Sequence, residues 1–149
     1  MEIKFIVPGE PRGKGRPRFS KSGHAYTDSE TRAYENKIIA HYRKAHGAFH
    51  FPDRAFVSVD VVAYLPISKS ATKARRAGME AGIILPSRKP DVDNIEKAVL
   101  DALNGIAYKD DVRVCRTSCS KFYGAEPRLE ITVKEVITDG MDRITSGPA

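Results

Sequence analysis

Residues 93–103 carry an unbroken helical repeat, and this repeat constrains the fold more than any other feature of the chain. Its apolar residues follow the i, i+3, i+4, i+7, i+8 spacing of one helix face: Ile95, Ala98, Val99, Ala102 and Leu103. Asn104 and Gly105 come next, a pair typical of a helix C-terminus. Because a helix with one apolar face must bury it, we expect this helix to pack on a sheet or on another helix.

Four segments show the alternation of apolar and polar residues that is typical of strands. They are residues 1–7, 55–65, 112–117 and 128–135. Residues 8–23, which follow the first strand, are rich in glycine, proline and basic residues and show neither a helical nor a strand period. We therefore predict a long loop there, and loops of this length are usually functional.

Two further segments are predicted to be helical. One runs from Thr27 to about Lys44, with Thr27 and Glu30 as a capping box, and the other is a short basic helix over 70–79. The order of these elements favours a single α/β (α+β) domain over residues 1–137, with a mixed β-sheet and packed helices. Residues 138–149 lack such patterns and are predicted to form a flexible C-terminal tail.

Composition places the chain among globular proteins of about one domain. Its 149 residues are 41% hydrophobic and 30% charged. Because no apolar run is long enough to span a membrane and no signal peptide is evident, we expect a cytoplasmic protein without a membrane partner. Cys115 and Cys119 would lie about 13 Å apart on a strand, so we expect two half-buried thiols. No nucleotide-binding motif is present, and no nucleotide cofactor is expected.

The basic residues of this +6 chain gather in two blocks, one within 10–23 and the other within 67–90. Segregated positive charge attracts nucleic acid through the release of counterions, although it can also serve only to solvate a surface. The residues expected to contact DNA phosphates are Arg12, Lys14, Arg16, Arg18, Lys69, Lys73, Arg75 and Arg76.

The acidic residues gather in a third segment, 89–111, which holds six of them: Asp91, Asp93, Glu96, Asp101, Asp110 and Asp111. Converging carboxylates are unfavourable without a cation, so a bound divalent ion is the natural occupant, and oxygen ligands suit Mg²⁺. Asp91 and Asp93 stand where the helix begins, and Lys97 follows one turn later on its exposed edge. Glu96 and Asp101 are interpreted as surface residues. Alternatively, Asp91 or Asp93 only caps the helix, and Lys97 only pairs with Asp93.

The run KPDVDNIEKAVLDALNG, followed by AYKDD, resembles the RusA-type endodeoxyribonucleases, the crossover-junction resolvases of bacteria and their prophages. PRGKGRPRF, YTDSETRAYE and SRKPDVDN are similar to other landmarks of that family, so the resemblance covers most of the chain. It implies a two-fold homodimer that cuts four-way DNA junctions with Mg²⁺. It also implies that Asp91 and Asp93 are paired metal carboxylates and that Lys97 is the catalytic lysine. The third metal ligand and catalytic aspartate is then Asp111, with Asp110 as the alternative.

These expectations combine into one predicted function. It is a Mg²⁺-dependent, structure-specific endodeoxyribonuclease that resolves four-way (Holliday) junctions by paired nicks in opposed strands, in DNA recombination and repair. Mg²⁺, or Mn²⁺ in its place, would be held by Asp91, Asp93 and Asp111, and Lys97 would stabilise the leaving oxygen. Two alternatives remain: a DNA-binding protein without catalytic activity, and an RNase-like nuclease that prefers another substrate.

Overall fold

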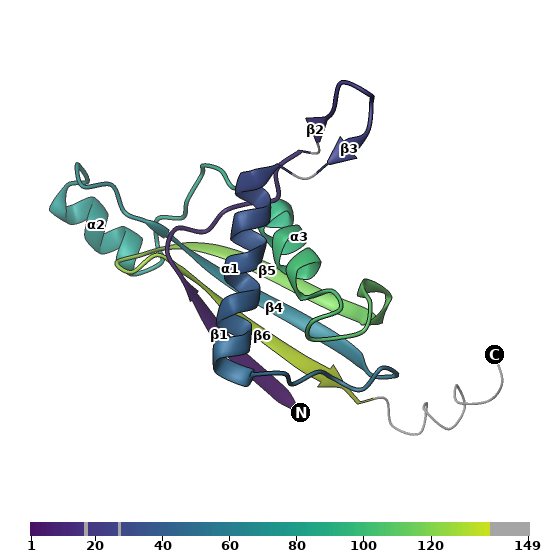
Figure 1. Cartoon of the computed structure of the whole chain (residues 1–149). Coiled ribbons are helices and arrows are strands. Elements are labelled where there is room, and N and C mark those ends of the chain that lie inside the picture. The colour runs from purple at the N-terminus through teal and green to yellow at the C-terminus, as the bar shows by residue number, and fades with distance from the viewer. Residues whose placement is uncertain (17, 27, 138–149) are drawn as a thin grey trace.

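The computed structural model describes residues 1–16, 18–26 and 28–137, and a four-stranded sheet is the centre of the fold (Figure 1). The strands are β1 (Glu2–Pro8), β4 (Phe56–Pro66), β5 (Val114–Gly124) and β6 (Arg128–Val136). They lie in the order β1-β6-β4-β5, with β4 and β5 parallel and the other neighbours antiparallel. The mixed sheet and the α/β class predicted from the sequence are confirmed.

Two helices, α1 (Ser29–His46) and α3 (Val92–Leu103), lie side by side on one face of this sheet (Figure 1). The helix α1 packs against β1, and α3 packs against β5. Because β4 and β5 are parallel, the chain must cross over between them, and α3 lies on that crossover. The short helix α2 (Lys73–Glu80) lies apart from this pair, near one end of the sheet.

The hydrophobic core lies between the two helices and the sheet. Alternate residues of β1 are buried, namely Ile3, Phe5 and Val7. On α3, all five apolar residues of the helical repeat are at most 2% exposed, so the apolar face predicted from the sequence is confirmed. Burial of each large aliphatic side chain contributes about 1.5–3 kcal/mol. The apolar stripe of α3 therefore fixes the orientation of the helix, and its opposite face is turned to solvent.

Two local predictions were wrong. The cap of α1 is Asp28, whose carboxylate accepts a hydrogen bond from the Thr31 amide at 2.8 Å; Thr27 lies outside the described residues. Asp is as good an N-cap as Thr, so composition alone did not separate neighbouring candidates. The long loop after β1 also contains a hairpin, in which β2 (Arg18–Phe19) pairs with β3 (Ala25–Tyr26). Two-residue strands are too short to show alternation in a sequence.

Other predictions differ from the structure mainly in their boundaries. The strand predicted over 112–117 is β5, which begins at Val114 after the 3₁₀ turn η1 (Asp111–Arg113) and continues to Gly124. Both cysteines are free, although Cys115 is exposed rather than half-buried. Within residues 1–16, 18–26 and 28–137, no helix has both the length and the apolar character needed to cross a membrane. The predicted tail, 138–149, lies outside the described residues.

Candidate active site

The N-terminal end of α3 presents two acidic side chains to solvent. Asp91 has the extended backbone of an N-cap residue, yet its carboxylate makes no capping hydrogen bond. Its side chain is 53% exposed and lies 3.6 Å from the Lys89 ammonium, a surface pair of little energetic weight. Asp93 stands exposed in the first turn. Asp91 thus occupies the N-cap position, as the alternative predicted, but its side chain does not cap the helix, and its carboxylate is accessible to a ligand.

Lys97 lies one turn after Asp93 and is also exposed. Among the ion pairs of the described residues, none joins Lys97 to Asp93. The alternative that these two side chains simply pair along the helix is thus not observed. This end of α3 thus carries Asp91, which makes only the surface pair with Lys89, together with Asp93 and Lys97, which make no ion pair within the described residues.

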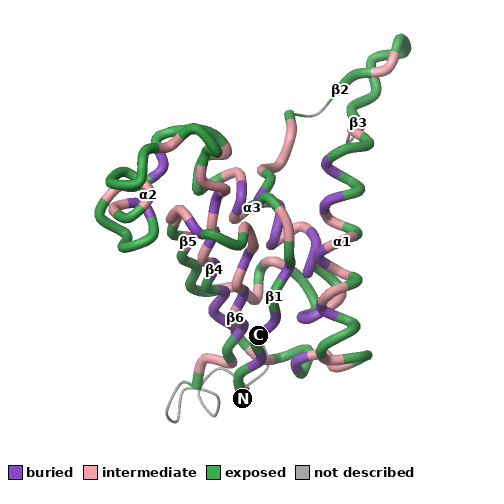
Figure 2. Tube along the Cα trace, turned by 90° about the vertical axis from the view of Figure 1, so that its left-hand side faces the viewer, coloured by how far each residue is buried: buried purple, intermediate pink, exposed green. Residues whose placement is uncertain are grey.

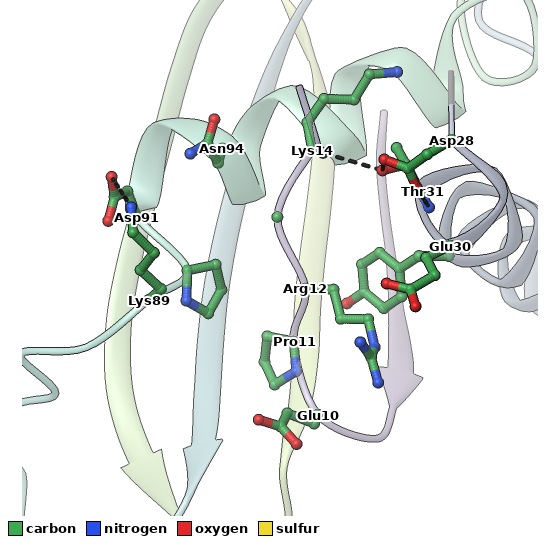
Figure 3. A pocket seen from close by; sticks show the side chains of 14 residues that line it. Glu10, Pro11, Arg12, Lys14, Asp28, Glu30, Thr31, Lys89, Asp91 and Asn94 are labelled. Atoms are coloured by element: carbon green, nitrogen blue, oxygen red, sulfur yellow. Dashed lines mark hydrogen bonds and ion pairs between the residues drawn. The ribbon is translucent and has the colours of Figure 1, made fainter. Parts of the chain in front are cut away.

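A cleft of about 380 Å³ opens beside this end of α3 (Figure 3). Its walls are the loop after β1, the start of α1 and the segment that leads into α3. Asp91, Asn94 and Arg12 are among the lining residues. The hydroxyl of Tyr34, a further lining residue, is buried and has no hydrogen-bond partner among the described residues, and burial raises the pKa of Tyr34 to about 12. The cleft therefore offers anionic, cationic and neutral polar groups next to the exposed carboxylates.

Hydrogen bonds join the loop after β1 to both α1 and α3. The Lys14 amide donates to the Asn94 carbonyl at 2.9 Å, and the Gly15 amide donates to Thr31 Oγ1 at 3.0 Å. At Gly13 the backbone passes so close to α3 that a Cβ would lie 2.9 Å from Asn94 Cβ and 3.0 Å from Pro90 Cβ. A glycine is required for this approach. The first glycine of RGKG thus brings the basic loop against the acidic end of α3.

Lys14 itself is not free for DNA. Its ammonium lies 3.0 Å from Glu35 and 3.1 Å from Asp101, and its side chain is only 17% exposed. Burial lowers the pKa of Lys14, but the hydrogen bonds that its ammonium donates to Glu35 and Asp101, and the negative charges of these two carboxylates, outweigh the burial, and the net shift is upward. Figure 3 shows the Lys14 side chain directed away from Asp91 and Arg12. The phosphate contact expected of Lys14 does not agree with this geometry, and the interpretation of Asp101 as a mere surface residue was wrong.

The remaining predicted ligands lie at the other end of α3. The Tyr108 hydroxyl lies 2.9 Å from the Leu100 carbonyl and 3.3 Å from Asp111 Oδ1. Asp111 is therefore beside Leu100, seven residues or about 10 Å along the helix axis from Asp93. Burial raises the pKa of Asp111, and Asp101 and Asp110 raise it further, whereas the Tyr108 hydrogen bond acts against them. Asp110 caps η1 by accepting from the Val112 amide at 3.3 Å.

The distance of Asp111 from Asp91 and Asp93 determines whether these three residues can form the predicted metal centre. In the part of the chain that the structure describes, no three Asp, Glu, His or Cys side chains lie close enough together to hold a metal ion. A centre built from Asp91, Asp93 and Asp111 of one chain therefore does not fit. Two carboxylates completed by water and substrate phosphates are, however, a common Mg²⁺ arrangement, and Asp91 and Asp93 offer the oxygen ligands that such a site needs.

Comparison with known proteins identifies the family. The family model of endodeoxyribonuclease RusA matches residues 8–134. This chain belongs to the RusA endodeoxyribonuclease family. A relative from Bacillus subtilis (strain 168), the uncharacterized protein YqaN, is 40% identical over 140 residues, which is 90% of this chain and 96% of the relative. The family match covers the basic loop, α1, both ends of α3, the strands β4 and β5 and most of β6.

In this RusA-family chain the predicted DNA contacts of the two basic blocks lie far apart. Arg12, Arg16 and Arg18 are exposed on the loop and hairpin next to α1, whereas those of the second block, Lys69, Lys73, Arg75 and Arg76, lie on and before α2. Figures 1 and 2 both show α2 and the hairpin on opposite sides of the molecule. Lys69, Lys73 and Arg75 are exposed, and Arg76 donates to the Ser68 carbonyl at 3.1 Å. The chain between α2 and α3 leads directly from this block to Asp91.

Sequence reasoning missed a lysine that positions the segment before Asp91. Lys121 reaches from β5 and donates to the Arg88 carbonyl at 2.8 Å and to the Pro90 carbonyl at 3.1 Å. These bonds tie residues 88–90 to the parallel strand that follows α3. A lone lysine in an exposed strand gives no signal of such a role, because its partners are backbone carbonyls some thirty residues earlier in the chain.

Proposed function

We propose that this chain is a Mg²⁺-dependent endodeoxyribonuclease that resolves four-way (Holliday) junctions and that it cuts DNA at the N-terminal end of α3. The observation that carries the proposal is the pair Asp91 and Asp93. Both are exposed at a helix N-terminus, and the Asp91 carboxylate serves no cap. Membership of the RusA family supports nuclease activity on DNA. The Asp91 carboxylate makes only an exposed pair with Lys89 at 3.6 Å, so both carboxylates remain accessible to a divalent cation.

In this proposal Asp91 and Asp93 hold the metal, and Mn²⁺ can replace Mg²⁺ there. Bound at these carboxylates, the ion supplies an activated water and a Lewis acid for the phosphoryl oxygens. Lys97 is a candidate catalytic residue because it is exposed one turn later and can donate to the developing charge on the leaving oxygen. Asp111 has no place in a set drawn from a single chain, and a metal role for it would require a second chain.

The DNA is held by the two basic blocks on either side of the acidic end. On the hairpin side the proposed phosphate contacts are Arg12, Arg16 and Arg18; on the α2 side they are Lys69, Lys73, Arg75 and Arg76. Lys14 leaves this set because Glu35 and Asp101 occupy its ammonium. Resolution needs two nicks in opposed strands, and each chain offers one such end of α3. We therefore propose that two chains pair in a two-fold homodimer.

The test is a cleavage assay on a synthetic four-way junction with each strand labelled in turn. We expect nicks in two opposed strands when Mg²⁺ is added, none in EDTA, and none in a duplex with the sequence of one arm. Asp93→Asn should bind the junction without cutting it. Junction binding without cleavage at any divalent ion would contradict the proposal in favour of the non-catalytic alternative. Equal cleavage of RNA substrates would favour the RNase-like one.

A further inference from the structure

The hairpin β2–β3 projects from the end of α1 and away from the sheet (Figures 1 and 2). Arg18 pairs with Tyr26, and Phe19 pairs with Ala25. Its turn is closed by the Ser20 amide, which donates to the His24 carbonyl at 2.8 Å, and by Gly23, whose φ of 85° suits the reversal of the chain. Such a small ribbon has little stability of its own in water. Its composition therefore calls for an explanation other than packing.

Two aromatic rings on this ribbon are left in solvent. Phe19 is 70% exposed and Tyr26 is 49% exposed. Directly opposed residues share one face of a ribbon, and successive residues alternate between faces. Tyr26 therefore shares a face with Arg18, and Phe19 lies on the other face. The ribbon thus presents one aromatic ring on each side, an arrangement that suits insertion between two flat groups and does not suit docking on one flat surface.

The charge around these rings matches nucleic acid. Residues 11–27 contain no acidic residue, and Arg16, Arg18 and Lys21 are exposed within them. Exposed cations interleaved with aromatic rings are the recognition elements of proteins that bind unpaired nucleotides, because the bases stack on the rings and the cations hold the phosphates. An acidic protein surface would satisfy the cations but would leave both rings in water.

The hairpin also lies within reach of the proposed cutting edge. The Lys14 amide is fixed to the Asn94 carbonyl at 2.9 Å on the first turns of α3. Phe19 follows five residues later, so an extended chain places it at most about 18 Å from Lys14. At about 3.4 Å for each nucleotide of one strand, this is a span of about five nucleotides. One DNA branch can therefore contact both elements.

We propose that the β2–β3 hairpin is a wedge that enters the centre of a branched DNA, with Phe19 and Tyr26 stacked on the unpaired or unstacked bases at either side. Arg18 and Lys21 then hold the adjoining phosphates. The inference rests on the proposed function, because it names the part of the junction that the enzyme recognises. Bases at a branch point are easier to separate than bases within a duplex, so the wedge favours branched over linear DNA.

The test measures metal-free binding, in EDTA, to a four-way junction that carries 2-aminopurine at the branch point or in the middle of one arm. With wild-type protein we expect the emission to change at the branch point only. Phe19→Ala combined with Tyr26→Ala should abolish that change and weaken junction binding about 10-fold relative to duplex binding. Phe19→Tyr should preserve both signals, because it keeps a stacking ring. Ile6→Ala, at a 54% exposed position on β1, is the matched control.

The outcomes separate this inference from the cutting activity. If the double variant binds junctions as wild type does and still changes the branch-point emission, the hairpin is not a wedge. If the branch-point signal is present but no divalent ion permits cleavage, the wedge stands and the proposed nuclease activity fails. If the wild-type protein cleaves junctions but gives no branch-point signal, the nuclease activity stands and the wedge fails. The melting temperature of each variant should equal that of wild type, because both rings lie outside the core.

Discussion

The two ends of α3 carry similar acidic residues in opposite circumstances. At the N-terminal end, Asp91 and Asp93 are exposed, and the Asp91 carboxylate caps no amide and makes only a surface pair with Lys89. At the C-terminal end, Asp101 holds the Lys14 ammonium and Asp111 lies against the Tyr108 hydroxyl, with both side chains partly buried. The first end can bind something external to the chain, whereas the second is largely occupied with holding the fold together.

This difference changes how the acidic run should be understood. In the sequence the six acidic residues fall within one segment. In the structure the acids at the N-terminal end of α3 lie about 10 Å along the helix axis from those at its C-terminal end. A carboxylate that the fold already uses is a poor candidate for a metal, and one that stays free at a helix N-terminus is a good candidate.

The largest effect is expected from Lys97→Met, which removes the exposed cation beside Asp93. Cleavage of the junction should slow by about 100-fold or more, as is usual when a group that stabilises developing charge is lost, and the melting temperature should not change. Lys109→Met is the matched control, since Lys109 is 63% exposed at the other end of the helix and makes only a long pair with Asp53. If Lys97→Met and Lys109→Met lose the same fraction of the single-turnover rate, the catalytic role is not specific to the N-terminal end of α3.

Lys14→Met should act on stability. It leaves Glu35 and Asp101 without their shared cation, and we expect the free energy of unfolding to fall by about 2 kcal/mol. Urea unfolding followed by circular dichroism measures the change. Lys4→Met, at a 72% exposed lysine paired with Glu2, should cost at most about 0.5 kcal/mol. If the two variants unfold alike, the Lys14 contacts have no structural weight.

The two halves of the basic loop should differ in their salt dependence. Replacing Arg16 and Arg18 with Ala should reduce the slope of log K against log salt by about 2, one unit for each lost phosphate contact. The slope of Lys14→Met should remain that of wild type, because its ammonium already lies between two carboxylates. Titrations of a fluorescent junction at several salt concentrations provide the slopes. A reduced slope for Lys14→Met alone would reverse the assignment.

The smallest effect concerns Asp111, and its sign follows from proton linkage. Burial raises the pKa of Asp111 above the ordinary 3.8, so the folded protein holds this proton more tightly than the unfolded chain does. Stability is therefore lost as the pH rises from 3.8 through the raised pKa, and the loss persists at neutral pH. Asp111→Asn should melt at a slightly higher temperature than wild type at pH 7, and this gain should vanish well below pH 3.8. A lower melting temperature at pH 7 would show that the ionised carboxylate stabilises the fold.

The sequence predicts most of the fold because burial leaves a periodic trace. The alternation in β1 and the helical repeat of α3 are both recorded in residue order, and both are confirmed by burial. The hairpin and the Asp28 cap leave no such trace, since two-residue strands show no period and several residue types cap equally well. The sequence also predicts that Asp91 and Asp93 stand where a helix begins, and both do lie at the start of α3.

What the sequence could not predict is the network of contacts between distant segments. Lys14 and Asp101 are 87 positions apart in the chain, and a basic loop gives no indication of which lysine is buried. Similarly, Lys121 binds backbone carbonyls, which every residue possesses. Free and engaged side chains of the same type look identical in a sequence, and only the fold distinguishes them.

The central claim is that the N-terminal end of α3 is the cutting end, and one assay tests it most directly. It compares Mg²⁺-dependent cleavage of a four-way junction by Asp93→Asn and by Asp101→Asn, at a temperature at which both variants are folded. We predict that Asp93→Asn loses cleavage by more than about 100-fold while it still binds the junction in EDTA, and that Asp101→Asn keeps cutting. Cleavage at the wild-type rate by Asp93→Asn, or loss of cleavage in folded Asp101→Asn alone, would contradict the account.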